Sequence, residues 1–156
     1  MEYLAIKALH ILCATVLFGT GLGTAFFFWF TYRSGNVTAI AHAARLTVLA
    51  DWVFTTPAVI AQPVTGLWLL HLANLDWRTG WVRTAIGLYL LTGACWLMVV
   101  WLQRRMRDLA ATAMRNGTAL PPVYRRYVWT WFVLGWPAFI AMLAVFWVMV
   151  VKPVAP

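Results

Sequence analysis

Charged residues are scarce in this sequence of 156 residues: they make up 10% of it, and only four are Asp or Glu. Hydrophobic residues make up 63%, which lies outside the range of ordinary soluble domains. Cysteine is nearly absent, and Cys13 and Cys95 fall in apolar stretches where a packing role is expected. No CxxC, HExxH or P-loop pattern occurs, so none of the metal or nucleotide sites that those motifs form is predicted.

Four stretches contain no Asp, Glu, Lys or Arg, and each is long enough to cross a hydrocarbon core, which takes ~20 helical residues. They are Ala8 to Tyr32, Trp52 to Leu75, Thr84 to Gln103 and Tyr127 to Val151. Because the connections are short, neighbouring helices should run antiparallel. The sequence therefore predicts an all-α integral membrane four-helix up-down bundle. It forms a single transmembrane domain over residues 1–156, with helices at about 5–32, 47–73, 82–115 and 125–152.

The connections carry most of the remaining polarity. The first, about Arg33 to Leu46, is expected to begin a short helix at AIAHAARL. In the third, RRMRDLAATAMR is expected to extend the third helix beyond the membrane until NGTALPP ends it. Five tryptophans near these ends are expected to be membrane anchors: Trp29, Trp52, Trp101, Trp129 and Trp131.

Basic residues are distributed unevenly between the two ends of the bundle. Eight arginines fall at one end: Arg33, Arg45, Arg104, Arg105, Arg107, Arg115, Arg125 and Arg126. Only Lys7, Arg78, Arg83 and Lys152 fall at the other. Since Lys and Arg are retained on the cytoplasmic side, we predict a multi-pass membrane protein with both termini outside the cytoplasm. The net charge of +8 then mostly reflects this uneven distribution, together with attraction to anionic headgroups of the lipid bilayer. No nucleic acid partner is expected.

Three glycines follow a histidine in the stretch KALHILCATVLFGTGLG. They lie inside a spanning helix whose amides are already paired, which excludes a dinucleotide-binding loop. Gly19 and Gly23 form a GxxxG pair, the pattern that lets a neighbouring helix approach closely, and a homo-oligomer through this pair is one possibility.

The third glycine shares a face with the histidine. Gly21 lies eleven residues after His10, close to three helical turns, which brings it within about 20° of the same side. Ala14 and Leu17 lie between them, so mostly small residues line a trough below the imidazole. A flat macrocycle whose iron is held by His10 would need such a trough. Alternatively, His10 forms a hydrogen bond inside the bundle.

The second predicted helix carries a polar stripe of Asp51, Thr55 and Gln62. An unpaired carboxylate in lipid is costly, so Asp51 should face the bundle, pair with Arg45 or another arginine, or lie at the interface. An ion pair is the first interpretation; a proton relay or contact with a quinone is the alternative. Pro57 and Pro63 should distort this helix and free backbone carbonyls for other partners.

Two further histidines are present. His71 ends the second helix on the same membrane side as His10, which makes an axial His10/His71 pair on one haem conceivable. On a regular helix, however, His71 is nearly opposite Gln62, so both would point inward only if the proline kink rotates the helix. His42 is expected to be solvated.

Several short motifs resemble one family. They are YLAIKALHILCATVLFGTGL, TTPAVIAQPVTGLWLL, LLTGACW and WPAFIAMLAVFWVMVVKP. Together they resemble the HemJ-type protoporphyrinogen oxidase superfamily of small membrane haem b proteins, and most closely an uncharacterised four-helix bacterial family within it. The resemblance implies that His10 is the haem-ligating histidine of the first helix.

The chain departs from the oxidases at several polar positions. At the start of the third helix the oxidases carry His and Lys, where this chain has Val82, Arg83 and Thr84. A second histidine of the oxidases is replaced in the region of Cys95, and their Asn-Glu is replaced by Leu134 and Gly135. The resemblance therefore implies haem binding rather than porphyrinogen oxidation, and we assign no catalytic residue.

Two interpretations of function follow from these patterns, and the resemblance implies a protein of the bacterial inner membrane. The first is an inner-membrane haem b protein with a redox or electron-transfer role and a quinone or a membrane redox subunit as partner. Its cofactor-binding residues are His10, His71, Gly21, Ala14 and Leu17, with His10 and His71 as metal ligands. The alternative is a non-enzymatic accessory subunit that packs on a larger complex.

Overall fold

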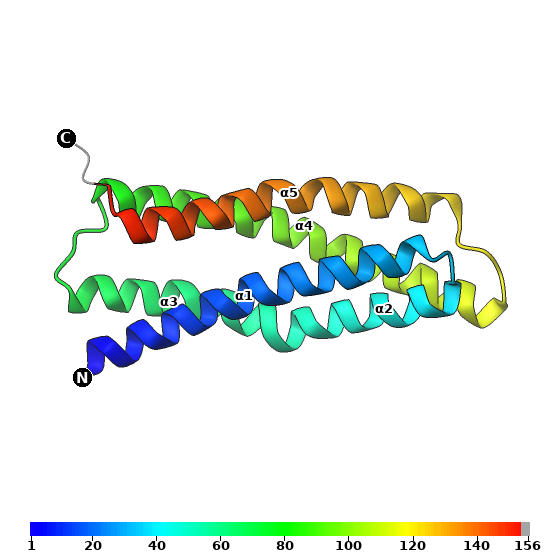
Figure 1. Ribbon diagram of the computed structural model, residues 1–156, viewed down its shortest axis with the longest axis horizontal. Coiled ribbons are helices and arrows are strands. Elements are labelled where there is room, and N and C mark those ends of the chain that lie inside the picture. Colours follow the sequence, from blue (N-terminus) through cyan, green and yellow to red (C-terminus); the bar gives the residue numbers. More distant parts are fainter. Residues whose placement is uncertain (154–156) are drawn as a thin grey trace.

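The computed structural model describes residues 1–153, and all regular structure in that range is helical. In chain order the elements are α1 (Glu2–Arg33), α2 (Val37–Ala50), the π-helical segment η1 (Asp51–Thr55), α3 (Thr56–Leu72), α4 (Gly80–Asn116) and α5 (Pro122–Val151). Since α2, η1 and α3 follow one another without a break, they form one long rod. Four rods thus run up and down the molecule, with both termini at the same end (Figure 1). Each is long and apolar enough to cross a membrane, which confirms the predicted all-α membrane bundle.

The turns between the rods contain residues that favour the end or the start of a helix. Gly35 and Gly117 adopt φ values of +70° and +62°, the left-handed conformation that glycine adopts at little cost. Asn36 caps α2, because its side chain accepts a hydrogen bond from the amide of Ala39 at 3.1 Å. At the start of α5, Pro122 occupies the first turn, where its missing N–H costs nothing.

The second rod begins earlier than the sequence indicated. We expected a connection up to about residue 46 with a short helix at AIAHAARL, whereas α2 is helical from Val37 and continues into η1 and α3. The rod from Val37 to Leu72 has 36 residues and is therefore roughly 54 Å long, well beyond the ~30 Å of a hydrocarbon core. Arg45 and His42 are exposed on one face of α2, whereas its other face carries small apolar residues at helical spacing.

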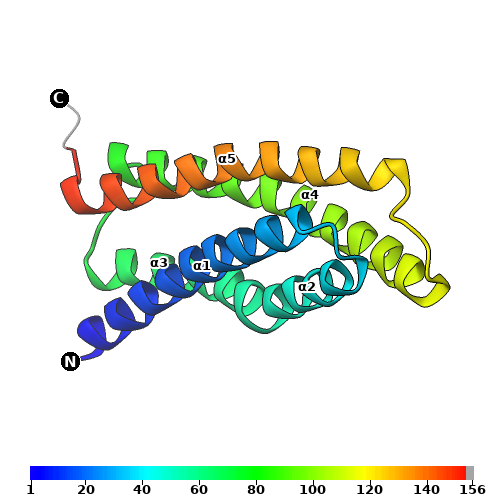
Figure 2. The ribbon, with the colours of Figure 1, turned by 45° about the vertical axis from the view of Figure 1, so that its right-hand side comes forward.

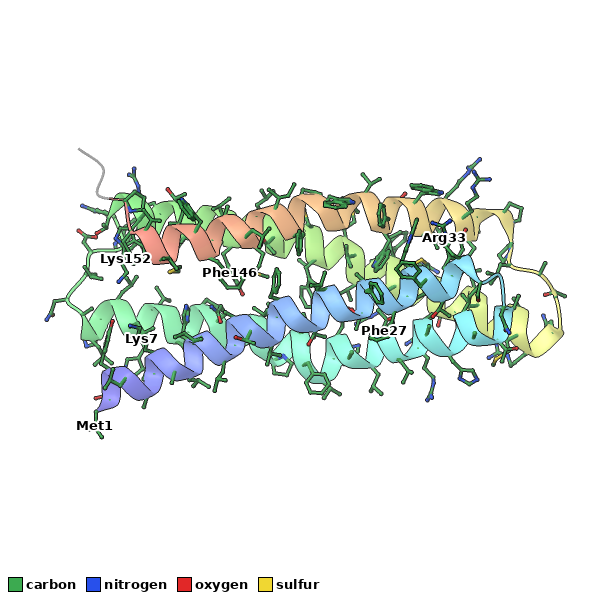
Figure 3. The ribbon with its side chains drawn as sticks, viewed as in Figure 1. Met1, Lys7, Phe27, Arg33, Phe146 and Lys152 are labelled. Atoms are coloured by element: carbon green, nitrogen blue, oxygen red, sulfur yellow. The ribbon has the colours of Figure 1, made fainter. Side chains whose placement is uncertain are left out.

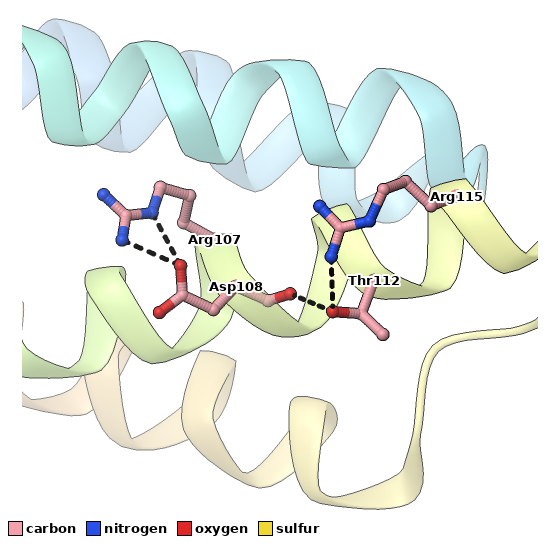
Figure 4. Close-up of polar contacts among 4 residues, drawn as sticks. All are labelled: Arg107, Asp108, Thr112 and Arg115. Carbon is pink, nitrogen blue, oxygen red and sulfur yellow. Dashed lines mark hydrogen bonds and ion pairs between the residues drawn. The ribbon is translucent and has the colours of Figure 1, made fainter.

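The tightest core lies at the end of the molecule opposite the termini, where the long helices α2 and α4 extend together. Phe28, Ile40, Met106, Tyr124 and Val128 are its most buried large side chains. They come from α1, α2, α4 and α5, so this cluster joins all four rods at one end. The arginine-rich extension of α4 carries one surface ion pair, between Arg107 and Asp108 at 2.7 Å (Figure 4).

Toward the termini the rods separate into two pairs, α1 with α3 and α4 with α5 (Figures 1 and 2). Lys7 and Lys152 lie at this end and Arg33 at the other (Figure 3). Aromatic rings connect the two pairs: Phe18 of α1 stacks on Phe139 of α5 at 5.4 Å and meets Phe146 edge-on at 5.6 Å.

Candidate functional site

His10 is held by α3 through both of its ring nitrogens. Nδ1 lies 2.8 Å from the hydroxyl of Thr65, and Nε2 lies 3.1 Å from the amide nitrogen of Gln62. Thr65 already donates its proton to the carbonyl of Ala61, so it accepts from His10. This network assigns a neutral imidazole that carries its proton on Nδ1 and accepts from Gln62 on Nε2.

A glycine makes this contact possible. A Cβ atom on Gly66 would lie 3.3 Å from Cε1 of His10, which is closer than most Cβ contacts. Glycine at this position therefore lets the imidazole lie flat against α3. The sequence predicted a hydrogen-bonded His10 as one alternative, and the structure confirms that alternative.

The predicted trough below His10 is divided between two environments. Leu17 and Gly21 line a large cavity between the two helix pairs, whereas His10 and Ala14 do not. A haem iron on His10 would need a free ring nitrogen that faces such a cavity, and both nitrogens are engaged with α3. The residues as arranged therefore do not fit a haem on His10. Haem b remains a prediction of the resemblance.

The remaining histidines lie elsewhere. His71 is exposed in the last turn of α3, nine residues after Gln62 and so on nearly the opposite side of the helix. The structure does not bring its ring to His10, and its ligand role stays a prediction. His42 is exposed, as predicted. Within residues 1–153, no group of three or more His, Cys, Asp or Glu side chains could hold a metal ion.

Asp51 occupies the π-helical turn between α2 and α3 and is buried, with 6% of its surface exposed. The hydroxyl of Thr55 donates to its Oδ1 at 2.9 Å, and the side chain of Gln103 on α4 faces the same carboxyl. The expected ion pair with Arg45 is wrong, because Arg45 is exposed and the described residues hold no salt bridge to Asp51. Hydroxyl and amide donors take the place of the arginine.

The two prolines act as the sequence predicted. Pro63 has no N–H to offer the carbonyl of Val59 four residues earlier. That carbonyl instead accepts a hydrogen bond from the hydroxyl of Tyr89 on α4, which ties the two helix pairs together. The widened turn of η1 directly precedes Pro57, whose ring would clash with a carbonyl in a regular helix. Such π-helical turns are frequent at functional sites.

Between the two helix pairs lies a cavity of about 440 Å³, within the size range of small-molecule sites. All four rods contribute to its mostly apolar lining, which includes Leu17, Gly21, Leu22, Phe26, Phe30, Asp51, Thr55, Val59, Tyr89, Thr92, Gly93, Trp96, Gln103, Trp131, Gly135 and Trp136. Leu22, Phe26, Phe30 and Trp136 are also exposed on the outer surface. The cavity therefore opens sideways, through the apolar surface between α1 and α5.

Unpartnered polar atoms gather around this cavity. Residues 1–153 contain six buried side-chain N or O atoms without a hydrogen-bond partner. Four of them belong to residues that line the cavity: Asp51 Oδ2, Gln103 Oε1, Trp96 Nε1 and Trp131 Nε1. These four atoms have almost no accessible surface, so they lie within the wall of the cavity and do not face its interior.

Two predictions about packing need correction. Trp131 is not a membrane anchor: it is 5% exposed and packs on Phe28 with ring centroids 5.2 Å apart. Gly19 and Gly23 make no close helix contact within residues 1–153, because a Cβ on either would meet nothing within 4 Å. If this GxxxG pair packs on a helix, that helix belongs to another molecule.

Sequence reasoning found Asp51, Thr55 and Gln62 but missed their partners on other helices. Thr65 continues the same stripe three residues after Gln62 and was the available signal. Gln103 could be noticed only as a polar residue at the end of a spanning stretch. Tyr89 and the tryptophans gave no signal, since aromatic residues are common in membrane helices.

The four long apolar helices are those of an integral membrane protein. The chain belongs to the family described as predicted integral membrane protein (DUF2269), whose model matches residues 4–153. Comparisons with curated proteins and with solved structures found no match.

Proposed function

We propose that this protein binds an amphipathic small molecule from within the membrane, in the cavity between the α1/α3 and α4/α5 pairs. The observation that carries the proposal is a mostly apolar cavity whose wall includes the polar residues Asp51, Thr55 and Gln103. The head of the ligand lies against these polar residues, and its apolar body lies against the aromatic and aliphatic lining. Such a division is typical of ligand sites, where a few polar groups orient a mostly apolar molecule.

The side opening supports a ligand that arrives through the bilayer. Leu22, Phe26 and Phe30 form one side of that opening on α1, and Trp136 forms the other on α5. None of these side chains is charged, so a lipid-soluble molecule can enter without crossing water. A membrane quinone or another lipid with a compact head belongs to this class.

In this proposal the arginine-rich end faces the cytoplasm of a bacterial inner membrane. Asp51 and Gln103 lie near that end, because Gln103 directly precedes the exposed Arg104 and Arg105. The polar head would therefore lie toward the cytoplasmic side, with the body of the ligand toward the middle of the bilayer. Electron transfer would need a redox centre besides the chain's own residues, supplied by a bound haem or a partner subunit.

A substitution that fills the cavity tests the proposal. A side chain on Gly93 would enter the cavity, because this glycine lines it and a Cβ there meets nothing within 4 Å. Gly87 on the same helix also has free space but does not line the cavity, so Gly87→Leu is the matched control.

Native mass spectrometry of the purified protein would report any molecule that remains bound, and solvent extraction would recover it. We expect one amphipathic molecule per chain in the wild type and in Gly87→Leu, and its loss in Gly93→Leu. Equal occupancy of both variants, or no bound molecule in any of the three proteins, would contradict the proposal.

A second candidate function rests on Gly19 and Gly23. Gly19 is exposed and Gly23 half-buried, and neither contacts another helix of this chain. Because small residues four apart favour close helix approach, this surface supports an accessory subunit that packs on a partner or on a second copy. Ligand binding and packing through this face are compatible.

A further inference from the structure

We infer that an anionic phospholipid binds on the outer surface between α1 and α5, with its phosphate at Arg33 and Arg125. The inference goes beyond the proposed function, because this lipid lies outside the cavity and extends along the border of its side opening. It depends on where these two residues, the arginine pair, lie relative to that opening and to the acidic residues of the chain.

The arginine pair lies where α1 ends and α5 begins. Arg33 is the last residue of α1, and Arg125 lies in the first turn of α5. The residues directly before them, Tyr32 and Tyr124, stack with ring centroids 6.0 Å apart. Arg33 therefore lies beside the first turns of α5 (Figure 3). Both arginines are exposed, so their guanidinium groups are available to a group at the surface.

Helical spacing places the arginine pair on the same faces as the side opening. Arg33 follows Phe26 by seven residues, and Arg125 precedes Trp136 by eleven. These separations are close to two and three helical turns, so each arginine lies within about 20° of a residue that borders the opening. At 1.5 Å per residue, the arginines lie roughly 10 to 17 Å along the helices from that border. A phospholipid whose phosphate binds the pair would therefore place its acyl chains beside the opening.

No carboxylate within residues 1–153 forms an ion pair with the arginine pair. The sequence of α5 contains no Asp or Glu, and the acidic residue of α1 is Glu2, at its other end. Asp108 on α4 pairs with Arg107, and Asp51 is buried. A phosphate supplies the missing anion, because guanidinium groups bind phosphate through charge-assisted hydrogen bonds.

The surface next to the arginine pair is aromatic. Trp29 of α1 stacks on Phe132 of α5 with ring centroids 4.3 Å apart, and Trp129 meets both rings edge-on. Trp129, Phe30 and Trp136 are exposed along the same surface. Tryptophan is favoured at the level of lipid headgroups, and acyl chains lie against the apolar rings beyond them. A soluble phosphate would use the arginines alone, whereas an anionic phospholipid uses both parts of this surface.

Native mass spectrometry of the purified protein in detergent micelles tests the inference with two lipids. The probes are phosphatidylglycerol and phosphatidylcholine with the same acyl chains, which differ in net charge. We expect the wild type to bind phosphatidylglycerol roughly 25-fold more tightly, since one arginine at an anionic surface contributes about fivefold. Arg33→Gln and Arg125→Gln should each lower the phosphatidylglycerol affinity about fivefold and leave the phosphatidylcholine affinity unchanged.

Three variants control for other effects. Arg45→Gln removes an exposed arginine at the same end of the molecule but on α2, so it should leave both affinities unchanged. Arg33→Lys keeps the charge and should retain most of the preference, which separates loss of charge from loss of fold. Gly93→Leu fills the cavity and should leave phosphatidylglycerol bound, so this variant distinguishes the surface lipid from the ligand of the cavity.

Three outcomes would overturn the inference. If the wild type binds no phosphatidylglycerol, or binds both lipids equally, the arginine pair does not select an anionic head. An equal loss of affinity in Arg33→Gln, Arg125→Gln and Arg45→Gln would assign the attraction to the whole basic end of the bundle. Loss of phosphatidylglycerol in Gly93→Leu would place this lipid inside the cavity, in which case the proposed function stands and the surface site does not.

Discussion

Replacing Gly66 by alanine tests whether His10 is clamped against α3. Alanine in a helix interior is usually more stabilising than glycine by about 1 kcal/mol. At Gly66, however, the new Cβ would lie 3.3 Å from Cε1 of His10. The imidazole is bonded to α3 at both nitrogens, so it can move only by losing one hydrogen bond, worth roughly 1 kcal/mol.

The two effects therefore oppose each other at Gly66 and not at Gly87. Gly87 also lies inside a helix, and a Cβ there meets nothing within 4 Å. We expect Gly87→Ala to stabilise the protein by about 1 kcal/mol and Gly66→Ala to be neutral or destabilising by about 1 kcal/mol. The difference between these variants, about 1 to 2 kcal/mol, is the quantity to measure by equilibrium unfolding in mixed micelles.

A double-mutant cycle assigns this difference to His10. In a His10→Ala background nothing opposes the new methyl group, so Gly66→Ala should become as stabilising as Gly87→Ala. The coupling between positions 10 and 66 should then be about 1 to 2 kcal/mol. If Gly66→Ala and Gly87→Ala stabilise the wild type equally, or the coupling stays within about 0.5 kcal/mol of zero, the imidazole is not clamped.

Three further predictions concern other parts of the molecule. Tyr89→Phe leaves the carbonyl freed by Pro63 without a donor and should lower the free energy of unfolding by about 1 kcal/mol in the same assay; an unchanged value would show that water or lipid replaces the hydroxyl. Gly19→Leu should disrupt any association in the membrane, measured by crosslinking, and normal association would exclude this face. After expression with ample haem, a Soret band that His10→Ala removes would support haem on His10. A spectrum without such a band, or one that His10→Ala leaves unchanged, would dismiss it.

The sequence by itself determined the class of protein and the number of crossings. In a bilayer the backbone N–H and C=O groups of a long uncharged stretch can all be hydrogen-bonded within that stretch only if it is a helix. The short connections then make neighbouring helices antiparallel. It also indicated that Asp51 and Gln62 share a helical face and that Pro63 frees a carbonyl. These properties depend only on helical periodicity and backbone chemistry within one segment of the chain.

The partners of those residues were decided by the tertiary structure. His10 lies 55 residues from Thr65, and Asp51 meets Gln103 from a third helix. Helical spacing states which residues share a face of one helix, but not which face of another helix lies opposite, because crossing angles and depth depend on packing along the whole length. The separation of the two helix pairs, and hence the cavity between them, exists only once the rods are assembled.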